Sequence, residues 1–405
     1  MNLPKSQLFQ EYLLRYGPLL MAVFMIAIYV STSASTIVSV LIGLLWFLSK
    51  QFNNLPSVLK NSSVSDWALL LYLCFIVGLL YGDAPRTEAF AMLRKYRELL
   101  YIPVLSCFFA NEHYRHYAWK AFLIASVLTL ITSYAMDFGI IDMLRHKTFT
   151  LKSRITHSIF IAFFMFYCAH KLFEKKNAYL WWSLLLLIGI YNLFFVVEGR
   201  TGQLVFMALV PLFAIQRFNK KGLFYAISGL IILLALYFNF SDKSGRIHEG
   251  LANTQNYLQH KSEKTPSSMG LRYSFWENSL KLVTEKPLLG YGTGGFAKEY
   301  QRITGSKMED VLNPHNEFLL IAVQFGLLGI FTYCGFLFSQ YYSAKILPDP
   351  EKWLAQGLLI TLIVSSLFNS PFFDHDGGHW FAILIALCFA PNNLDYKNLA
   401  NSDNA

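Results

Sequence analysis

Charged side chains are scarce in this sequence. Asp, Glu, Lys and Arg make up 15% of its 405 residues, and 55% are hydrophobic, whereas an ordinary soluble domain carries roughly 25% charged residues. Long uncharged runs recur along the chain, and about 20 apolar residues let a helix cross the hydrocarbon of a bilayer. The composition excludes a soluble enzyme and predicts an all-α integral membrane protein with many spans.

Cysteine is sparse as well. The five cysteines lie inside apolar runs, are odd in number and show no CxxC spacing, which excludes a disulfide scaffold and a zinc-thiolate site. The formal net charge is +9. In a soluble chain this excess suggests nucleic acid, but in a membrane protein it first reports topology and anionic headgroups. We therefore expect membrane lipids as neighbours and no nucleic-acid partner.

The apolar runs predict twelve transmembrane helices. They lie near residues 17–31, 35–49, 66–82, 91–110, 119–136, 155–170, 178–197, 201–216, 222–240, 316–341, 353–371 and 378–390. Residues 1–240 then hold spans 1–9, residues 316–391 hold spans 10–12, and residues 392–405 form a tail. The single long connection, 241–315, is mostly polar, and we expect it to be partly helical.

Basic residues in the short loops predict the orientation, because they favour the cytoplasmic side. One side holds 15 Lys and Arg and the other nine, so the tail is expected in the cytoplasm and the long loop outside. The nine outward residues cluster before spans 4, 6 and 8: Arg86, Arg94, Lys95, Arg97, Arg145, Lys147, Lys152, Arg154 and Arg200. They either pair with nearby acids and headgroups or bind a lipid-linked phosphate or diphosphate, whose oxygens suit the guanidinium fork.

A polar motif stands directly before span 10: Asn313-Pro314-His315-Asn316-Glu317. Asn313 is predicted to cap the helix, with Pro314 in its first turn. His315 then lies at the outward mouth of the span, where the helix dipole keeps the imidazole neutral. A neutral His can accept a proton from a sugar hydroxyl; the alternative is an interfacial His that only caps the helix.

Two arginines stand apart from the other charges. Arg200 lies in a glycine-flanked break between two spans, where it can approach a ligand beside a helix N-terminus; the alternative is snorkelling to headgroups. Arg272 opens the stretch Leu271–Trp276, whose aromatics at i+1, i+3 and i+4 favour a position on the bilayer surface. Its alternative is an ordinary solvated loop arginine.

Other motifs give weaker evidence of function. The run Gly290–Gly295 has neither a preceding strand nor a following Lys-Ser/Thr, so it predicts a flexible turn and not a nucleotide site. The stretch Asp374–His379 matches no established ligand spacing and favours a wet interfacial loop, so we expect no metal site. Acids are nearly absent from the middle of the spans, which disfavours a proton-coupled transporter.

The order of these motifs resembles the O-antigen ligase and polymerase superfamily. Arg200 is followed by Arg272 with Trp276, by the glycine-rich stretch at 287–296, and by His315-Asn316, a gap of nine residues and Gly326-Leu327-Leu328-Gly329. The His-Asn, gap, Gly-x-x-Gly pattern is fairly specific, whereas the arginines alone are not. The resemblance covers the whole topology, with its motifs concentrated at 199–329.

The resemblance implies a metal-independent, cofactor-free, inverting glycosyltransferase of the bacterial inner membrane. It would move a glycan from undecaprenyl diphosphate to a hydroxyl acceptor on the periplasmic face, so the loop 241–315 would be periplasmic. His315 would be the general base or orient the acceptor, and Arg200 and Arg272 would hold the diphosphate and stabilise the leaving group. Further contacts to the diphosphate are expected from Arg86, Arg94, Arg97, Arg145, Arg154 and Asn316.

Three kinds of superfamily member share these motifs: ligases that attach O-antigen to the lipid A-core, polymerases that extend it, and protein O-oligosaccharyltransferases. The last usually carry an added C-terminal domain, and here the sequence ends about 15 residues after the final predicted span. We therefore expect an O-antigen ligase of lipopolysaccharide biosynthesis, with a polymerase as the second interpretation. A lipid or polysaccharide transporter is the alternative from another class, and it needs no catalytic His at a loop end.

Overall fold

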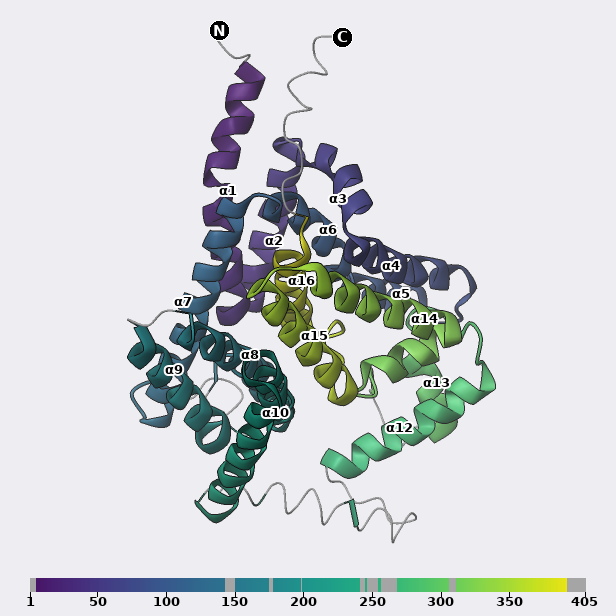
Figure 1. Cartoon of the computed structure of the whole chain (residues 1–405). Coiled ribbons are helices and arrows are strands. Elements are labelled where there is room, and N and C mark those ends of the chain that lie inside the picture. The colour runs from purple at the N-terminus through teal and green to yellow at the C-terminus, as the bar shows by residue number, and fades with distance from the viewer. Residues whose placement is uncertain are drawn as a thin grey trace.

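The structure of the chain is a computed structural model (Figure 1). It describes residues 5–142, 150–174, 178–197, 199–240, 245, 254–255, 268–305 and 311–391. Every element in these ranges is helical, which confirms the all-α prediction for this part of the chain. The main elements are α1 (Lys5–Val30), α2 (Thr32–Leu48), η1 (Gln51–Asn54), α3 (Leu55–Asn61), α4 (Ser63–Tyr81), α5 (Arg86–Lys95), α6 (Glu98–Phe109), α7 (Glu112–Asp137), α8 (Arg154–Leu172), α9 (Tyr179–Tyr191), η3 (Asn192–Val196), α10 (Arg200–Phe240), α12 (Ser268–Glu285), α13 (Gly295–Thr304), α14 (Glu317–Ile346), α15 (Glu351–Phe368) and α16 (His375–Phe389).

The described residues contain nine helices that are long and apolar enough to cross a membrane, or ten if α2 and the segment Gln51–Asn61, bent by 79°, form one span. Two of the twelve predicted spans are not among them. The span at 91–110 is divided between α5 and α6, and α16 has only 15 residues. The multi-span prediction is confirmed, and the count of twelve is not.

Helix α10 turns back on itself. The ring of Phe194 lies 5.7 Å from that of Phe206 and 5.6 Å from that of Tyr237. In a straight helix Phe206 and Tyr237 would be about 46 Å apart at 1.5 Å per residue. The element therefore forms two spans, Arg200–Phe218 and Lys220–Phe240, in agreement with the two spans predicted there.

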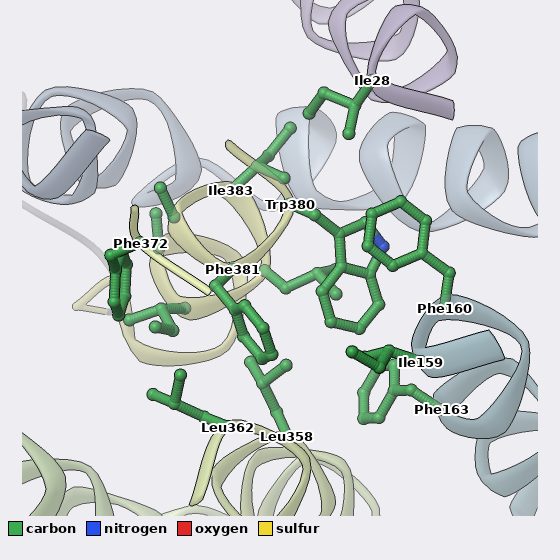
Figure 2. Close-up of a cluster of buried hydrophobic side chains, with 14 of the residues drawn as sticks. Ile28, Ile159, Phe160, Phe163, Leu358, Leu362, Phe372, Trp380, Phe381 and Ile383 are labelled. Atoms are coloured by element: carbon green, nitrogen blue, oxygen red, sulfur yellow. The ribbon is translucent and has the colours of Figure 1, made fainter. Parts of the chain in front are cut away.

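The core centres on α16, which is buried along nearly its whole length. Figure 2 shows Trp380 and Phe381 of α16 packed among side chains of α8 and α15. The Trp380 ring stacks on Phe160 at 4.5 Å, and its indole N–H donates to the hydroxyl of Tyr29 at 2.9 Å. A helix that is apolar on every side packs in an interior, so α16 is the element around which the longer helices gather.

The run Gly290–Gly295 and the Gly326–Gly329 motif lie in two segments that pair through their backbones. Gly326 has φ 58° and ψ −144°, a conformation open to glycine, and it interrupts α14. A Cβ atom on Gly290 or on Gly326 would lie 2.5 Å from the backbone of the other segment. Four backbone hydrogen bonds of 2.8–3.3 Å join the segments: the N–H groups of Tyr291, Gly292, Leu327 and Leu328 donate to the carbonyls of Val323, Gln324, Pro287 and Leu288. The run forms a turn, as predicted, but these bonds fix it against α14, so the expected flexibility is wrong.

Candidate functional site

His315 projects from a turn just before α14. Its φ is 52°, in the left-handed region that few residues other than glycine adopt. The side chain of Asn313 accepts a hydrogen bond from the His315 N–H at 2.7 Å. Because the positive φ ends helical geometry at this point, the N-cap is Asn316, whose side chain accepts from Leu319 N–H. The prediction that Asn313 caps the helix is wrong, and Pro314 lies before the first turn.

The imidazole of His315 is held in one orientation. Its Nδ1 lies 3.3 Å from Oδ1 of Asn369, and the ring lies nearly parallel to Phe275 at 6.1 Å. Because the amide oxygen only accepts, Nδ1 carries the hydrogen and Nε2 keeps its lone pair. Burial lowers the pKa of His315, and the charge of Arg272 lowers it further. Both effects favour the neutral ring that the sequence predicts, although their causes are burial and Arg272 and not the helix dipole.

Arg272 of α12 lies near enough to Arg200 of α10 and to His315 for their charges to interact. Burial lowers the pKa of the Arg272 guanidinium, and the neighbouring charge of Arg200 adds to the effect. The Trp276 indole N–H donates to the carbonyl of Pro314 at 3.0 Å, which holds α12 against the His315 turn. The face predicted to lie on the bilayer surface is therefore directed inward at Phe275 and Trp276. Two converging guanidinium groups favour an anion between them.

Glycines place Arg200 at the start of α10. A Cβ atom on Gly199 or Gly202 would overlap Ser158 of α8, and one on Gly199 would also lie 2.8 Å from the carbonyl oxygen of Arg154. The N-terminal ends of α8 and α10 therefore touch, and the backbone of Arg154 lies beside that of Gly199. Both helix ends add positive potential at this point, as predicted for Arg200.

The buried Glu317 holds Asn369, the residue that contacts His315, in place. The N–H of Glu317 donates to the carbonyl of Asn369 at 3.1 Å. Its carboxylate accepts from the Tyr96 hydroxyl and from the Phe372 N–H, and both Glu317 and Tyr96 are fully buried. Asn369 was not predicted, since no local pattern marks it, whereas an acid directly after His-Asn was a signal for Glu317.

The basic residues of α5 and of the turn that follows it lie in different surroundings. Arg94 and Arg97 line a cavity of about 510 Å³ together with apolar residues such as Phe90. Arg86 is exposed at the start of the helix, and Arg145 lies outside the described residues. The Asn316 side chain caps α14 and donates to the Leu367 carbonyl, so its amide is engaged within the chain. Diphosphate binding by these residues stays a prediction.

One of the nine basic residues pairs with an acid that is distant in the sequence. The Lys152 ammonium lies 2.8 Å from Asp376 Oδ1 and 3.0 Å from the Thr32 hydroxyl, at a second cavity of about 300 Å³. The wet-loop prediction for Asp374–His379 is wrong, because His375 begins α16 and His379 is fully buried.

The comparisons with known proteins match the part of the chain that contains these site residues. Residues 182–334 match the family model described as O-antigen ligase, a range that contains Arg200, Arg272, His315 and the glycine-rich run. A protein of Haemophilus influenzae, described as uncharacterized, is 27% identical over 205 residues, which is 47% of this chain and 51% of that protein. The match thus spans about half the length of this relative. Over residues 182–334 the chain is therefore similar to the O-antigen ligase family.

Proposed function

We propose that this protein is an O-antigen ligase, which transfers a glycan from undecaprenyl diphosphate to a sugar hydroxyl of the lipid A-core on the periplasmic face of the bacterial inner membrane. The observation that carries the proposal is the convergence of Arg200, Arg272 and a neutral His315. These are the groups that transfer from a diphosphate leaving group to a hydroxyl requires: positive charge fixed near the diphosphate and a base near the acceptor.

His315 acts on the acceptor. Its Nε2 takes the hydroxyl proton while the acceptor oxygen forms a bond to the anomeric carbon of the glycan. The bond from that carbon to the carrier diphosphate breaks on the opposite side, which inverts the configuration, and the electron pair leaves with the diphosphate. A positioned base contributes roughly 10²–10⁴ to such a rate.

The arginines act on the donor. Arg200 and Arg272 stabilise the charge that develops on the leaving diphosphate, a role that a planar guanidinium performs by bidentate contact. The cavity at α5 suits the carrier, because Arg94 and Arg97 offer contacts to phosphate and Phe90 and Leu93 offer apolar contacts to the isoprenoid. The Tyr96–Glu317 bond ties this helix to the His315 turn.

The test is complementation of a ligase-deficient strain, with lipopolysaccharide resolved on a gel. The wild-type chain is expected to restore long O-antigen on the lipid A-core. His315→Ala should leave the core bare while undecaprenyl-linked glycan accumulates on the outer face. His113→Ala is the matched control, because His113 is exposed in α7 away from the site.

Other outcomes identify the alternatives. A polymerase would leave cores with a single repeat unit when it is missing, and a transporter would strand its cargo on the cytoplasmic side. Wild-type-like lipopolysaccharide from a well-expressed His315→Ala variant would overturn the assignment of His315 as the base.

A further inference from the structure

Buried polar atoms without a hydrogen-bond partner among the described residues gather where α6 meets α16. They are Nε of Arg97, both carboxylate oxygens of Glu98, Nδ1 of His375 and Nε2 of His379. Glu98 and His379 are fully buried, and the His375 side chain is 26% exposed. Buried polar groups are almost always satisfied, so this cluster requires a partner that the described residues do not supply.

Three of these side chains converge from two helices. His375 and His379 are four residues apart in α16, a spacing that places both imidazoles on one face. Glu98 begins α6, and one ligand atom from each of the three residues lies within 4.8 Å of the others. A Cβ atom on Gly378 would lie 3.1 Å from the Glu98 Cγ, so the absence of a side chain there admits the carboxylate beside the helix.

One tautomer of His375 leaves a ring nitrogen with a free lone pair. Nε2 lies 3.0 Å from the Thr36 hydroxyl and 3.3 Å from Arg97 Nη2, and Nδ1 lies 3.9 Å from Asp376 Oδ1. When Nε2 carries the hydrogen and donates to Thr36, whose own hydroxyl donates to the Thr32 carbonyl at 2.9 Å, Nδ1 is the acceptor nitrogen. Because a guanidinium only donates, this tautomer, which metal binding at Nδ1 selects, requires Arg97 Nη2 to turn away from Nε2.

Neither Glu98 nor His379 is satisfied by its neighbours. Nδ1 of His379 lies 2.9 Å from the His375 carbonyl oxygen and 3.3 Å from Glu98 Oε1. When Nδ1 donates to the carbonyl, Nε2 keeps an unused lone pair. The Arg97 Nε approaches the Glu98 carboxylate only to 3.9 Å, without hydrogen-bond geometry. An unpaired buried carboxylate is costly, and a cation held between the three side chains removes that cost.

We propose that Glu98, His375 and His379 bind one divalent transition-metal ion, for which Zn²⁺ is the reference. Two imidazoles and one carboxylate form an established zinc donor set that leaves a fourth position for water. The ligand atoms must close from within 4.8 Å to roughly 3.4 Å, the separation set by bonds of about 2.1 Å in a tetrahedron, so metal binding requires the imidazoles and the carboxylate to rotate toward one another. The Thr36 hydroxyl then orients His375 from its other nitrogen.

The ion would position residues and take no part in the transfer chemistry. It joins the first turn of α6 to the first turn of α16, and so fixes Arg97, which directly precedes Glu98 and lines the α5 cavity. It also anchors the end of the turn that carries Asn369. This proposal replaces the expectation of no metal site, and it does not depend on which glycan, if any, the protein transfers.

The test measures metal directly on the full-length protein. The chain is purified in detergent through a tag without histidine, loaded with Zn²⁺, desalted and analysed by inductively coupled plasma mass spectrometry. Wild type is expected to retain roughly one ion per chain, and His379→Gln and Glu98→Gln are expected to lose it. The control His113→Gln removes an exposed imidazole and should retain the ion.

Cobalt provides a second measurement that needs no variant. Co²⁺ bound by this donor set should give the visible absorption bands of a four-coordinate site in wild type, and equimolar Zn²⁺ should abolish them. If Glu98→Gln fails to fold, as judged by gel filtration, His375→Gln takes its place. A monodisperse wild-type protein that retains no zinc and shows no cobalt bands would overturn the proposal, as would zinc retained at the wild-type level in His379→Gln.

Discussion

Asn369 offers the sharpest test of how His315 works. Its Oδ1 lies 3.3 Å from the His315 Nδ1, so Asn369→Ala removes one neutral hydrogen bond, a contribution of about 0.5–1.5 kcal/mol. Because tenfold in rate corresponds to about 1.4 kcal/mol, kcat should fall roughly 2- to 10-fold. The turn should persist, since the Glu317 N–H bonds to the backbone carbonyl of residue 369.

The companion variant Asn369→Asp tests the charge state of the ring. In wild type, burial and the charge of Arg272 lower the pKa of His315, so activity should be lost only as the pH falls through that lowered value. A carboxylate beside Nδ1 stabilises imidazolium and should raise the pKa of His315 by about one to three units. Because the base must be neutral, the acid limb of the rate profile should move to higher pH by the same amount.

The assay is transfer from a labelled lipid-linked glycan by the purified enzyme, followed between about pH 5 and 9, where a histidine titrates. Asn192→Ala is the matched control, because it removes an Asn–His bond of 2.8 Å to His157, outside the site; its acid limb should stay at the wild-type position. An acid limb unchanged in a folded Asn369→Asp variant would refute the reasoning that His315 titrates as the base.

Four further outcomes are expected. Arg200→Lys should lose transfer nearly as fully as Arg200→Ala in the same assay, because an ammonium does not reproduce a bidentate fork; full activity of the Lys variant would leave Arg200 a headgroup contact. Gly202→Ala should destabilise the protein by about 1–3 kcal/mol in thermal unfolding, since the new Cβ overlaps Ser158 of α8. A reporter inserted after Lys221 should be cytoplasmic and one at Thr254 periplasmic in a protease-protection experiment, with a cytoplasmic Thr254 contradicting the site's orientation. Added Mg²⁺ should leave the transfer rate unchanged, and stimulation by Mg²⁺ would show that the arginines do not suffice for the diphosphate.

The helices and the three central residues, Arg200, Arg272 and His315, could be predicted from the sequence because both depend on local signals. Apolar runs mark the two halves of α10 without any knowledge of their packing, and the order of Arg200, Arg272 and His315 carries a family resemblance. The same runs do not decide the place of α16, since a mostly apolar helix of 15 residues is as typical of a buried interior helix as of a short span. Length alone did not separate them.

The features that could not be predicted from the sequence depend on contacts between distant segments. Asn369 lies 54 positions from His315 in the chain, and neither its neighbours nor its spacing mark it. The partner of Lys152 likewise lies on the last helix, at Asp376, and not among the nearby acids. The glycines indicated an unusual backbone conformation. The close approach of the segments that contain Gly290 and Gly326 becomes visible only in the structure, where the two segments pair.

That pairing sets an order for biogenesis. A nascent chain emerges from its N-terminus, so the N–H groups of Tyr291 and Gly292 leave the ribosome before the carbonyls of Val323 and Gln324 that accept from them. Backbone groups without partners are poorly tolerated at membrane depth. The mouth of the site can therefore be completed only after α14 has entered the bilayer, and a chain truncated before Val323 should reach the membrane with this mouth unfinished and exposed to quality control.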